Sequence, residues 1–284
     1  MGEIHIVTDS SARFENRRFA EEYNVTVVPN RVFFGDRMYL DGRDISAEDV
    51  LQRMRHDSVP LRVQGPTVEA FQEVYQQLTR VTDQIFVVLH SQQLSEAYRH
   101  AQAACAGLLG RCDITVIDSQ TASAGLGYLV EAMAEAVEDG ASPDDLVRIT
   151  RGAVARLYSV YYVETLDYIQ RGGLLATTQA IIGAMLEIKP LITLEDGKLI
   201  TMEKARTHVQ AIDKMIEFVA EFTAIEKMCI LQNTQRVTER TRILQDRLAL
   251  EFEEANYPIM LYDPLIASYL GPDAMGMVVL EGEE

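Results

Sequence analysis

The feature that most constrains the fold of this chain is the repeated alternation of short apolar runs with longer amphipathic patterns. Residues 4–8, 84–89 and 113–117 are short runs rich in branched apolar side chains, which is typical of buried strands. Helical periodicity follows at 95–109, and small residues at 119–127 lead into another helix. Strands and helices that alternate in this way indicate βαβ units. We therefore expect an α/β fold whose N-terminal part contains a mostly parallel sheet.

Shorter signals add detail to this part of the chain. A further apolar run at 25–28 predicts a strand that ends at a proline. Runs at 32–34 and 38–40 flank a Gly-Asp pair, which predicts a hairpin. Ser46 and Thr67 each precede a helical pattern and are expected to cap its N-terminus.

The pattern changes beyond residue 140, where a second group of elements begins. Residues 140–145 predict a new helix start, and 159–164 predict a strand. Runs at 190–194 and 199–202 flank Glu-Asp-Gly, which is a strong hairpin signal. The remaining expected elements are helices at about 207–222 and 237–252 and strands at 228–231 and 258–262.

Length and charge narrow the classes of protein to consider. The chain has 284 residues, and because a domain averages about 150 residues we expect two α/β domains, 1–160 and a smaller 161–284. Its 43 acidic and 26 basic residues give a net charge of −17, which argues against binding to nucleic acid or to anionic membranes. We find no signal peptide, no membrane-spanning run and no zinc-type cysteine spacing, so we expect a cytoplasmic protein with reduced thiols.

Polar loops fall where ligands bind in α/β sheets, at the carboxyl ends of the expected strands. Three of them, 9–11, 90–95 and 118–121, follow predicted strands, and a fourth at 63–67 precedes a helix. Each offers hydroxyls or free backbone N–H groups, which suit an anionic head group. Each could also simply cap a helix, but their convergence on one sheet edge favours a binding site.

Signals for catalysis are weak. His90 and Ser91 suggest a nucleophile pair, but a hydrolase also needs an orienting group and an oxyanion hole, and there is no Gly-x-Ser-x-Gly motif. Asp9 could accept a phosphoryl group, yet Ser11 stands where a second acid would help to hold magnesium. We predict no catalytic residue, no metal and no cofactor. Arg171, beside two glycines, could bind an anion or form an ion pair between domains.

Residues 174–188 are apolar on nearly every side, so a helix formed by them must be enclosed. They could form ordinary core or the wall of a tunnel for an acyl chain. Burying a methylene gains about 0.8 kcal/mol, so a chain of ~14 methylenes would gain roughly 11 kcal/mol before the costs of binding. The candidate tunnel residues are Leu174, Ile181, Ile182, Met185 and Leu186.

Taken in order, these segments resemble the DegV family of bacterial fatty-acid-binding proteins. The resemblance covers nearly the whole chain and is carried by residues 6–11, 118–125, 166–173, 188–191 and 271–276. It implies a DegV-like fold of two α/β domains that holds a long-chain fatty acid such as palmitate, with the carboxylate toward the N-terminal sheet. It also implies a non-enzymatic acyl carrier, which in some members presents the fatty acid to a separate kinase.

The chain departs from the family pattern where the head group should bind. Val63 stands in place of a carboxylate-binding threonine, Glu96 replaces a glycine, and Leu174 and Tyr269 replace an arginine and a histidine. Ser95 retains a head-group hydroxyl. One lost donor to a charged group costs about 1.5–3 kcal/mol, so fatty-acid binding can survive while hand-over to a kinase is less secure. The alternative is a ligand with a non-carboxylate head group. The expected head-group residues are Ser95, Gln64, Val63, Arg171 and Tyr269.

Overall fold

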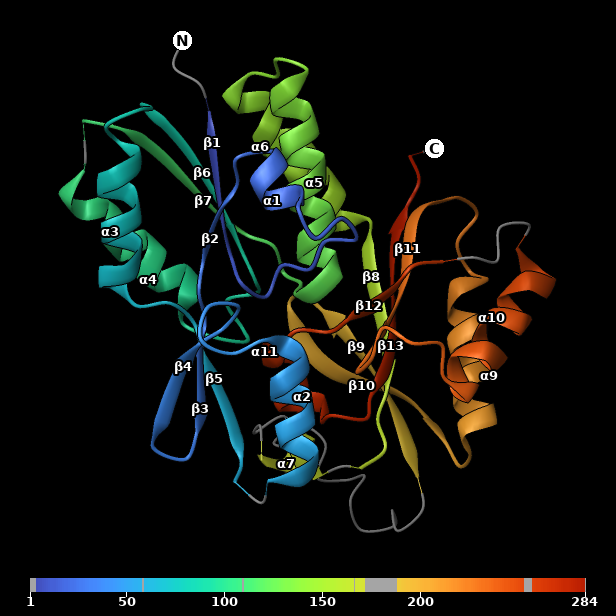
Figure 1. Ribbon diagram of the computed structural model, residues 1–284. Coiled ribbons are helices and arrows are strands. Elements are labelled where there is room, and N and C mark those ends of the chain that lie inside the picture. The colour runs from blue at the N-terminus through green and yellow to red at the C-terminus, as the bar shows by residue number, and fades with distance from the viewer. Residues whose placement is uncertain are drawn as a thin grey trace.

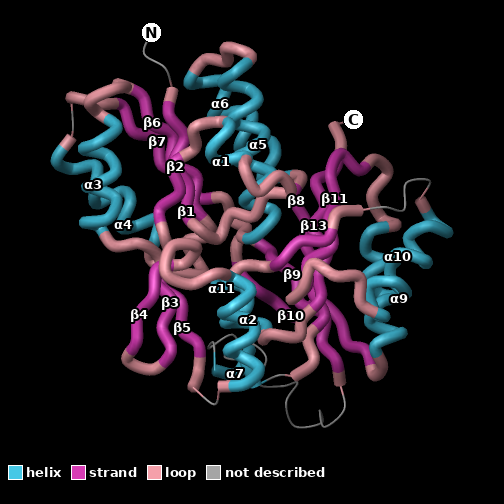
Figure 2. The backbone as a smooth tube through the Cα atoms, viewed as in Figure 1, coloured by secondary structure: helices cyan, strands magenta, loops and turns pink. Residues whose placement is uncertain are grey.

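The computed structural model shows a mixed α/β architecture (Figures 1 and 2). It describes residues 4–57, 59–108, 110–165, 167–171, 188–252 and 257–283.

The N-terminal part is built on a parallel sheet, as the sequence predicts. Within the described ranges this sheet has four strands, and every neighbouring pair is parallel. Its central strands carry apolar side chains on both faces, because helices cover both sides. In spatial order the strands are β2 (Thr26–Val28), β1 (His5–Asp9), β6 (Gln84–Leu89) and β7 (Asp113–Asp118).

Helices pack on the two faces of this sheet (Figure 1). Thr67 and Ser142 accept backbone hydrogen bonds at helix N-termini, which confirms two of the predicted starts. One face carries α3 (Val68–Leu78) and α4 (Ala97–Ala104), which a 3₁₀ turn extends at Cys105–Gly107; on the other side lie α1 (Phe19–Glu22), α5 (Ser123–Glu138) and α6 (Pro143–Ala155).

A small antiparallel sheet extends from the carboxyl edge of the parallel one. The predicted hairpin is confirmed, and Ser46 caps the following helix, α2 (Ala47–His56). A third strand joins the hairpin and contains Val63 and Gln64, so the prediction of a loop at 63–67 was wrong for these two residues. The order is β4 (Arg37–Leu40), β3 (Arg31–Phe34) and β5 (Leu61–Gln64).

The C-terminal part contains a second sheet, which has six strands among the described residues. Among these six described strands only β11 and β12 pair in parallel, so most of this sheet is antiparallel. The hairpin around residues 195–197 is confirmed, with Asp196 and Gly197 both at positive φ. The order is β10 (Lys198–Ala205), β9 (Lys189–Glu195), β8 (Leu157–Tyr162), β13 (Met275–Glu281), β11 (Ile225–Gln232) and β12 (Ile259–Leu261).

Helices cover this second sheet from outside and join it to the small sheet. Two of them, α9 (His208–Val219) and α10 (Glu239–Glu251), pack on its outer face (Figure 1). The helix α11 (Pro264–Leu270) packs against β5, α2 and α7 (Asp167–Arg171). The domain boundary near residue 160 stays a prediction.

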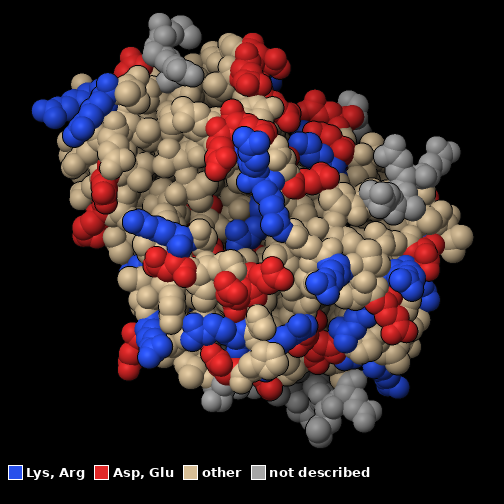
Figure 3. Space-filling model, in the orientation of Figure 1, with Lys and Arg blue, Asp and Glu red and all other residues tan. Residues whose placement is uncertain are grey.

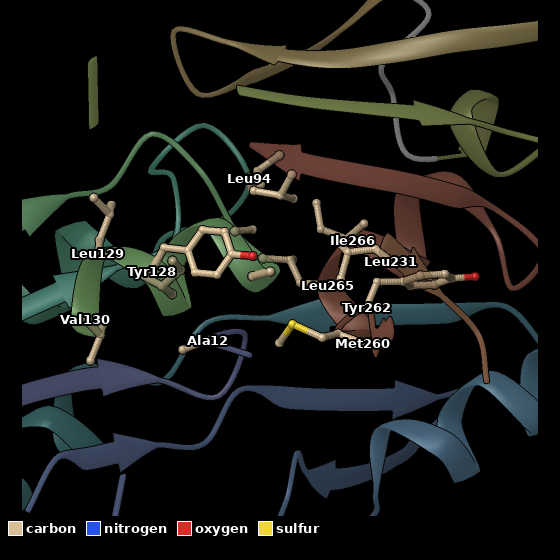
Figure 4. Close-up of a cluster of buried hydrophobic side chains, with 14 of the residues drawn as sticks. Ala12, Leu94, Tyr128, Leu129, Val130, Leu231, Met260, Tyr262, Leu265 and Ile266 are labelled. Carbon is tan, nitrogen blue, oxygen red and sulfur yellow. The ribbon is translucent and has the colours of Figure 1, made fainter. Parts of the chain in front are cut away.

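One apolar cluster is shared by the two halves of the molecule. It contains Phe86 of the parallel sheet, Leu231 of the second sheet and Ile266 of α11. Figure 4 shows Leu94, from the loop after β6, beside Leu265 and Ile266. The second half is therefore held on the carboxyl edge of the parallel sheet by a continuous core.

We expect Gly127→Ala to lower the free energy of unfolding by about 1–3 kcal/mol. A Cβ at Gly127, in α5, would lie only 1.9 Å from the carbonyl oxygen of Arg13. Gly152→Ala is the matched control, because Gly152 is an exposed glycine of α6 with nothing within 4 Å of an added Cβ, and it should stabilise by about 0.5–1 kcal/mol. Urea denaturation measures both, and equal effects would contradict the close packing.

Candidate functional site

A buried carboxylate lies at the carboxyl edge of the parallel sheet. Asp9, at the end of β1, is fully buried and accepts hydrogen bonds from the backbone N–H and hydroxyl of Ser11 at 2.9 and 2.5 Å. Asn30, after β2, donates its amide at 3.0 Å, and the backbone N–H of His90, after β6, donates at 2.9 Å. One side chain therefore links the ends of three adjacent strands.

The ring of His90 faces this carboxylate and is also fully buried. Its Nδ1 lies 2.9 Å from Oδ1 of Asp9. Burial alone would raise the pKa of Asp9, but the His90 ring and the hydrogen bonds from Ser11 and His90 hold it well below its usual range. Burial alone would lower the pKa of His90, but the carboxylates of Asp9, Asp263 and Asp118 outweigh that effect and raise it. The pair therefore favours an ionised carboxylate beside an imidazolium.

Ser95 continues this array toward the surface. Its Oγ lies 2.5 Å from Nε2 of His90 and accepts a hydrogen bond from the backbone N–H of Ala97 at 3.1 Å. Ala97 is the first residue of α4, so the hydroxyl sits at the start of a helix. Unlike Asp9 and His90, Ser95 is partly exposed.

The turn after β5 packs directly on Ser95. A Cβ at Gly65 would lie 2.8 Å from the Ser95 hydroxyl, so only glycine allows this approach. Arg31 donates to the carbonyl of Gly65 at 3.0 Å, and Nδ1 of His100 lies 2.8 Å from the carbonyl of Pro66. These contacts hold the backbone of the turn beside the hydroxyl.

The C-terminal half reaches the same place through α11. The hydroxyl of Tyr269 donates to the carbonyl of Leu94 at 2.8 Å, and burial raises its pKa, which keeps this proton in place. Val63 of β5 packs in the same apolar cluster as Leu94 and Tyr269, and Gln64 follows it in the strand. Of the other four expected head-group residues, Val63, Gln64 and Tyr269 thus lie in segments that adjoin the loop of Ser95.

The remaining predicted residues cannot be placed around it. Arg171 ends α7, but its side chain lies outside the described residues. The same holds for every expected tunnel residue, namely Leu174, Ile181, Ile182, Met185 and Leu186.

Glu96, which replaces a glycine of the family pattern next to Ser95, points away from the site. Its side chain is 61% exposed and its Oε2 lies 3.1 Å from Nη1 of Arg99. The negative charge is therefore directed into solvent and partly screened by an arginine. The replacement of glycine at this position does not place a carboxylate against Ser95.

The nucleophile pair proposed from the sequence is not formed. Ser91 donates its hydroxyl to the carbonyl of Gly197, in the β9–β10 turn, at 2.7 Å. His90 instead contacts Ser95, five residues along the chain, a pairing that no motif in the sequence indicates. The arrangement Ser95–His90–Asp9 has the order of a Ser-His-Asp triad, although a triad needs a neutral histidine to accept the serine proton. Asp9 itself is enclosed by donors, so it cannot serve as a phosphoryl acceptor in this state.

Two features are absent from the described part of the chain. No group of three or more His, Cys, Asp or Glu side chains is placed to share a metal ion there. Nor does that part of the chain contain a helix with the length and apolar character needed to cross a membrane.

The fold and this site define a class of protein: an α/β protein with a parallel sheet and a second, larger mixed sheet, and with an Asp-His-Ser array at the carboxyl edge of the parallel sheet. The chain belongs to the DegV family, described as uncharacterised proteins, whose model matches residues 3–282. A DegV domain-containing protein of Streptomyces coelicolor is 31% identical over 278 residues, covering 97% of this chain and 98% of that protein. One of Caldanaerobacter subterraneus is 31% identical over 280 residues, covering 98% of each.

Solved structures agree with this assignment. A DegV family protein of Thermus thermophilus, described as binding fatty acid, has a TM-score of 0.85 at 26% identity, with 99% of this chain and all of that chain covered. A stearic-acid-binding protein of Eubacterium ventriosum has a TM-score of 0.84 at 21% identity, with 99% and 98% covered. The predicted family and the mixed α/β fold are thereby confirmed.

The cap of α11 carries a second buried carboxyl near His90. Asp263 is fully buried and accepts hydrogen bonds from the backbone N–H groups of Leu265 and Ile266 at 2.8 and 3.2 Å. Burial raises its pKa from 3.8 to about 6, although the charge of Arg13 opposes the shift. Between these two pH values the folded protein binds more protons than the unfolded chain, so this group lowers stability as the pH rises through that window.

We expect Asp263→Asn to stabilise the protein by about 1–3 kcal/mol at pH 8 and by less at pH 4.5, where the folded carboxyl is still largely protonated. The amide keeps an oxygen for the cap and removes the buried charge. The control is Asp145→Asn, at an exposed capping box where hydrogen bonds from Ser142 and Arg148 lower the pKa of Asp145, and it should destabilise at pH 8. Thermal unfolding at both pH values measures the effects. A loss of stability in Asp263→Asn at pH 8 would contradict the assignment.

Proposed function

We propose that this protein is a non-catalytic carrier that binds a long-chain fatty acid, with Ser95 at the head group. The observation that carries the proposal is that two segments remote in sequence meet at the loop after β6, which carries Ser95. The Gly65 turn packs against the Ser95 hydroxyl, and Tyr269 of α11 donates to the carbonyl of the preceding residue, Leu94. The hydroxyl lies at a helix start, beside a histidine whose pKa is raised and against an apolar cluster. This combination suits an acid group joined to an apolar chain.

The described relatives support the same class of ligand. The Thermus thermophilus protein is described as binding fatty acid and shares 26% identity over the whole fold. The protein of Ruminococcus gnavus is described with vaccenic acid, and that of Eubacterium ventriosum with stearic acid. Basic and acidic side chains are interspersed on the face shown in Figure 3, which does not suggest a nucleic-acid partner for that face.

A second candidate is a lipid with an uncharged head group. The observation that favours it is Val63, which lines the same cluster as Leu94 and has no hydrogen-bond donor in its side chain. In this candidate Gln64 and the Gly65 turn supply neutral polar contacts. The two candidates differ in one measurable property, the charge of the bound head group.

We also propose that the carrier presents its fatty acid to a separate kinase, which would phosphorylate the carboxylate. Support comes from the family resemblance and from the partial exposure of Ser95. The test is to incubate the loaded protein with a fatty-acid kinase and ATP and to measure acyl phosphate. Because Val63 removes one donor that would orient the carboxylate, turnover is expected to be slower than with a carrier that has threonine there.

We expect native mass spectrometry of the purified protein to show one bound lipid per chain, and denaturing extraction to identify it as a long-chain fatty acid. A buried acyl chain of ~14 methylenes gains roughly 11 kcal/mol before costs, enough to survive purification. A fatty alcohol or other neutral lipid would support the second candidate. Protein free of lipid that also fails to take up added fatty acid would contradict both.

Restoring the missing donor should strengthen binding of a fatty acid. We expect Val63→Thr to lower the dissociation constant for oleate about tenfold or more, because a hydrogen bond to a charged group contributes about 1.5–3 kcal/mol. Val63→Ala is the control for altered packing, since it removes apolar contacts without adding a donor. Displacement of a fluorescent fatty acid measures both, and weaker binding in Val63→Thr than in Val63→Ala would argue for a neutral head group.

A further inference from the structure

The hydrogen bonds around Ser95 limit where its hydroxyl proton can point. A serine hydroxyl has one proton to donate and two lone pairs that accept. The backbone N–H of Ala97 occupies one lone pair at 3.1 Å. One lone pair and the hydroxyl proton remain. His90, whose Nε2 lies 2.5 Å from the Ser95 Oγ, uses one of them and leaves the other for a ligand.

The charge of His90 determines whether the Ser95 hydroxyl donates its proton to His90 or to a ligand. Since the ionised Asp9 can only accept, Nδ1 of His90, 2.9 Å from its Oδ1, carries a proton in either charge state. When the ring is neutral, its bare Nε2 accepts the proton of Ser95, and Ser95 presents only a lone pair to a ligand. When the ring is charged, Nε2–H donates to Ser95, both lone pairs are used, and the hydroxyl proton is free to donate to a ligand.

Acidic groups from three elements favour the charged state of His90. Asp9 faces it from β1, Asp118 from the end of β7 and Asp263 from the N-cap of α11. Arg13, which lies 3.6 Å from Asp41, acts on Asp263 and favours the ionised form of that carboxyl. With three acidic groups around one ring, the folded protein stabilises the imidazolium.

We propose that His90 sets the direction of the Ser95 hydroxyl and thereby selects an ionised carboxylate over an uncharged head group. The inference rests on the proposed function, because it takes Ser95 as the residue that contacts the head group. His90 acts here as a positioning residue, since its partners are Asp9 and Ser95 rather than the ligand. Binding of a carboxylate is then linked to retention of one proton on His90.

The first test uses the unaltered protein and two probes, oleate and oleyl alcohol, at pH 6.5 to 9. Oleate affinity is expected to fall roughly ten- to a hundredfold as His90 loses its proton, whereas the affinity for the alcohol, which can donate to Ser95, should not fall. In ¹⁵N-labelled protein, saturating oleate should raise the pKa of His90 by about one unit for each tenfold fall in oleate affinity, and oleyl alcohol should not.

Two variants of His90 separate its contact with Ser95 from its contact with Asp9. In His90→Gln the amide N–H can reach Ser95 and donates at every pH, so oleate binding is expected to lose its pH dependence. In His90→Asn the amide reaches Asp9 but is too short for Ser95, so oleate should bind roughly tenfold or more weakly throughout the range. Ser95→Ala should remove the discrimination between oleate and the alcohol.

The results distinguish failure of this inference from failure of the proposed function. Oleate binding that is independent of pH in the unaltered protein, together with an unchanged pKa of His90, overturns the role of His90 and leaves the carrier function standing. Binding of oleyl alcohol with no binding of oleate overturns the fatty-acid function and the inference with it. The titration of His90 in the unaltered protein decides the question even where a variant does not fold.

Discussion

The carboxyl edge of the parallel sheet depends on one buried charge, the carboxylate of Asp9. It receives hydrogen bonds from residues that follow β1, β2 and β6, so it fixes the positions of three strand ends at once. A buried carboxylate without partners would be strongly unfavourable, and replacing any one partner would leave part of this charge unsatisfied. The loops after β1, β2 and β6 are therefore joined by hydrogen bonds to one buried charge.

Apolar packing also holds the loop after β6 in position. The loop that carries His90 continues into Leu94, which packs against α11, while Tyr269 of α11 donates to the carbonyl of the same residue. The β9–β10 turn contacts the same loop, because Ser91 donates to Gly197. The site thus lies where the two halves of the chain meet. The shared core holds Ser95 against the Gly65 turn.

Local sequence patterns predict most strands of the parallel sheet. They do not predict how the strands of the second sheet pair. Branched apolar runs and capping residues such as Ser46 and Thr67 determine structure through contacts within a few residues. The strands and helix starts that they specify can therefore be predicted from the sequence. The strands β5 and β13 were not predicted, and periodicity does not distinguish parallel from antiparallel pairing. The contact between His90 and Ser95 depends on the conformation of the intervening loop. The available signal was that His90 and Asp9 both end strands at one edge.

The same array of Asp9, His90 and Ser95 could serve two kinds of chemistry, and the charge of the ring separates them. A serine nucleophile requires His90 to accept a proton, whereas a bound carboxylate is best served when His90 donates one. Three neighbouring acids stabilise the protonated ring, which cannot act as a base. The acid-rich surroundings therefore favour a binding site over a catalytic one. In the proposed carboxylate site, a Ser95 donor held in place by an imidazolium would offset part of the donor lost at Val63.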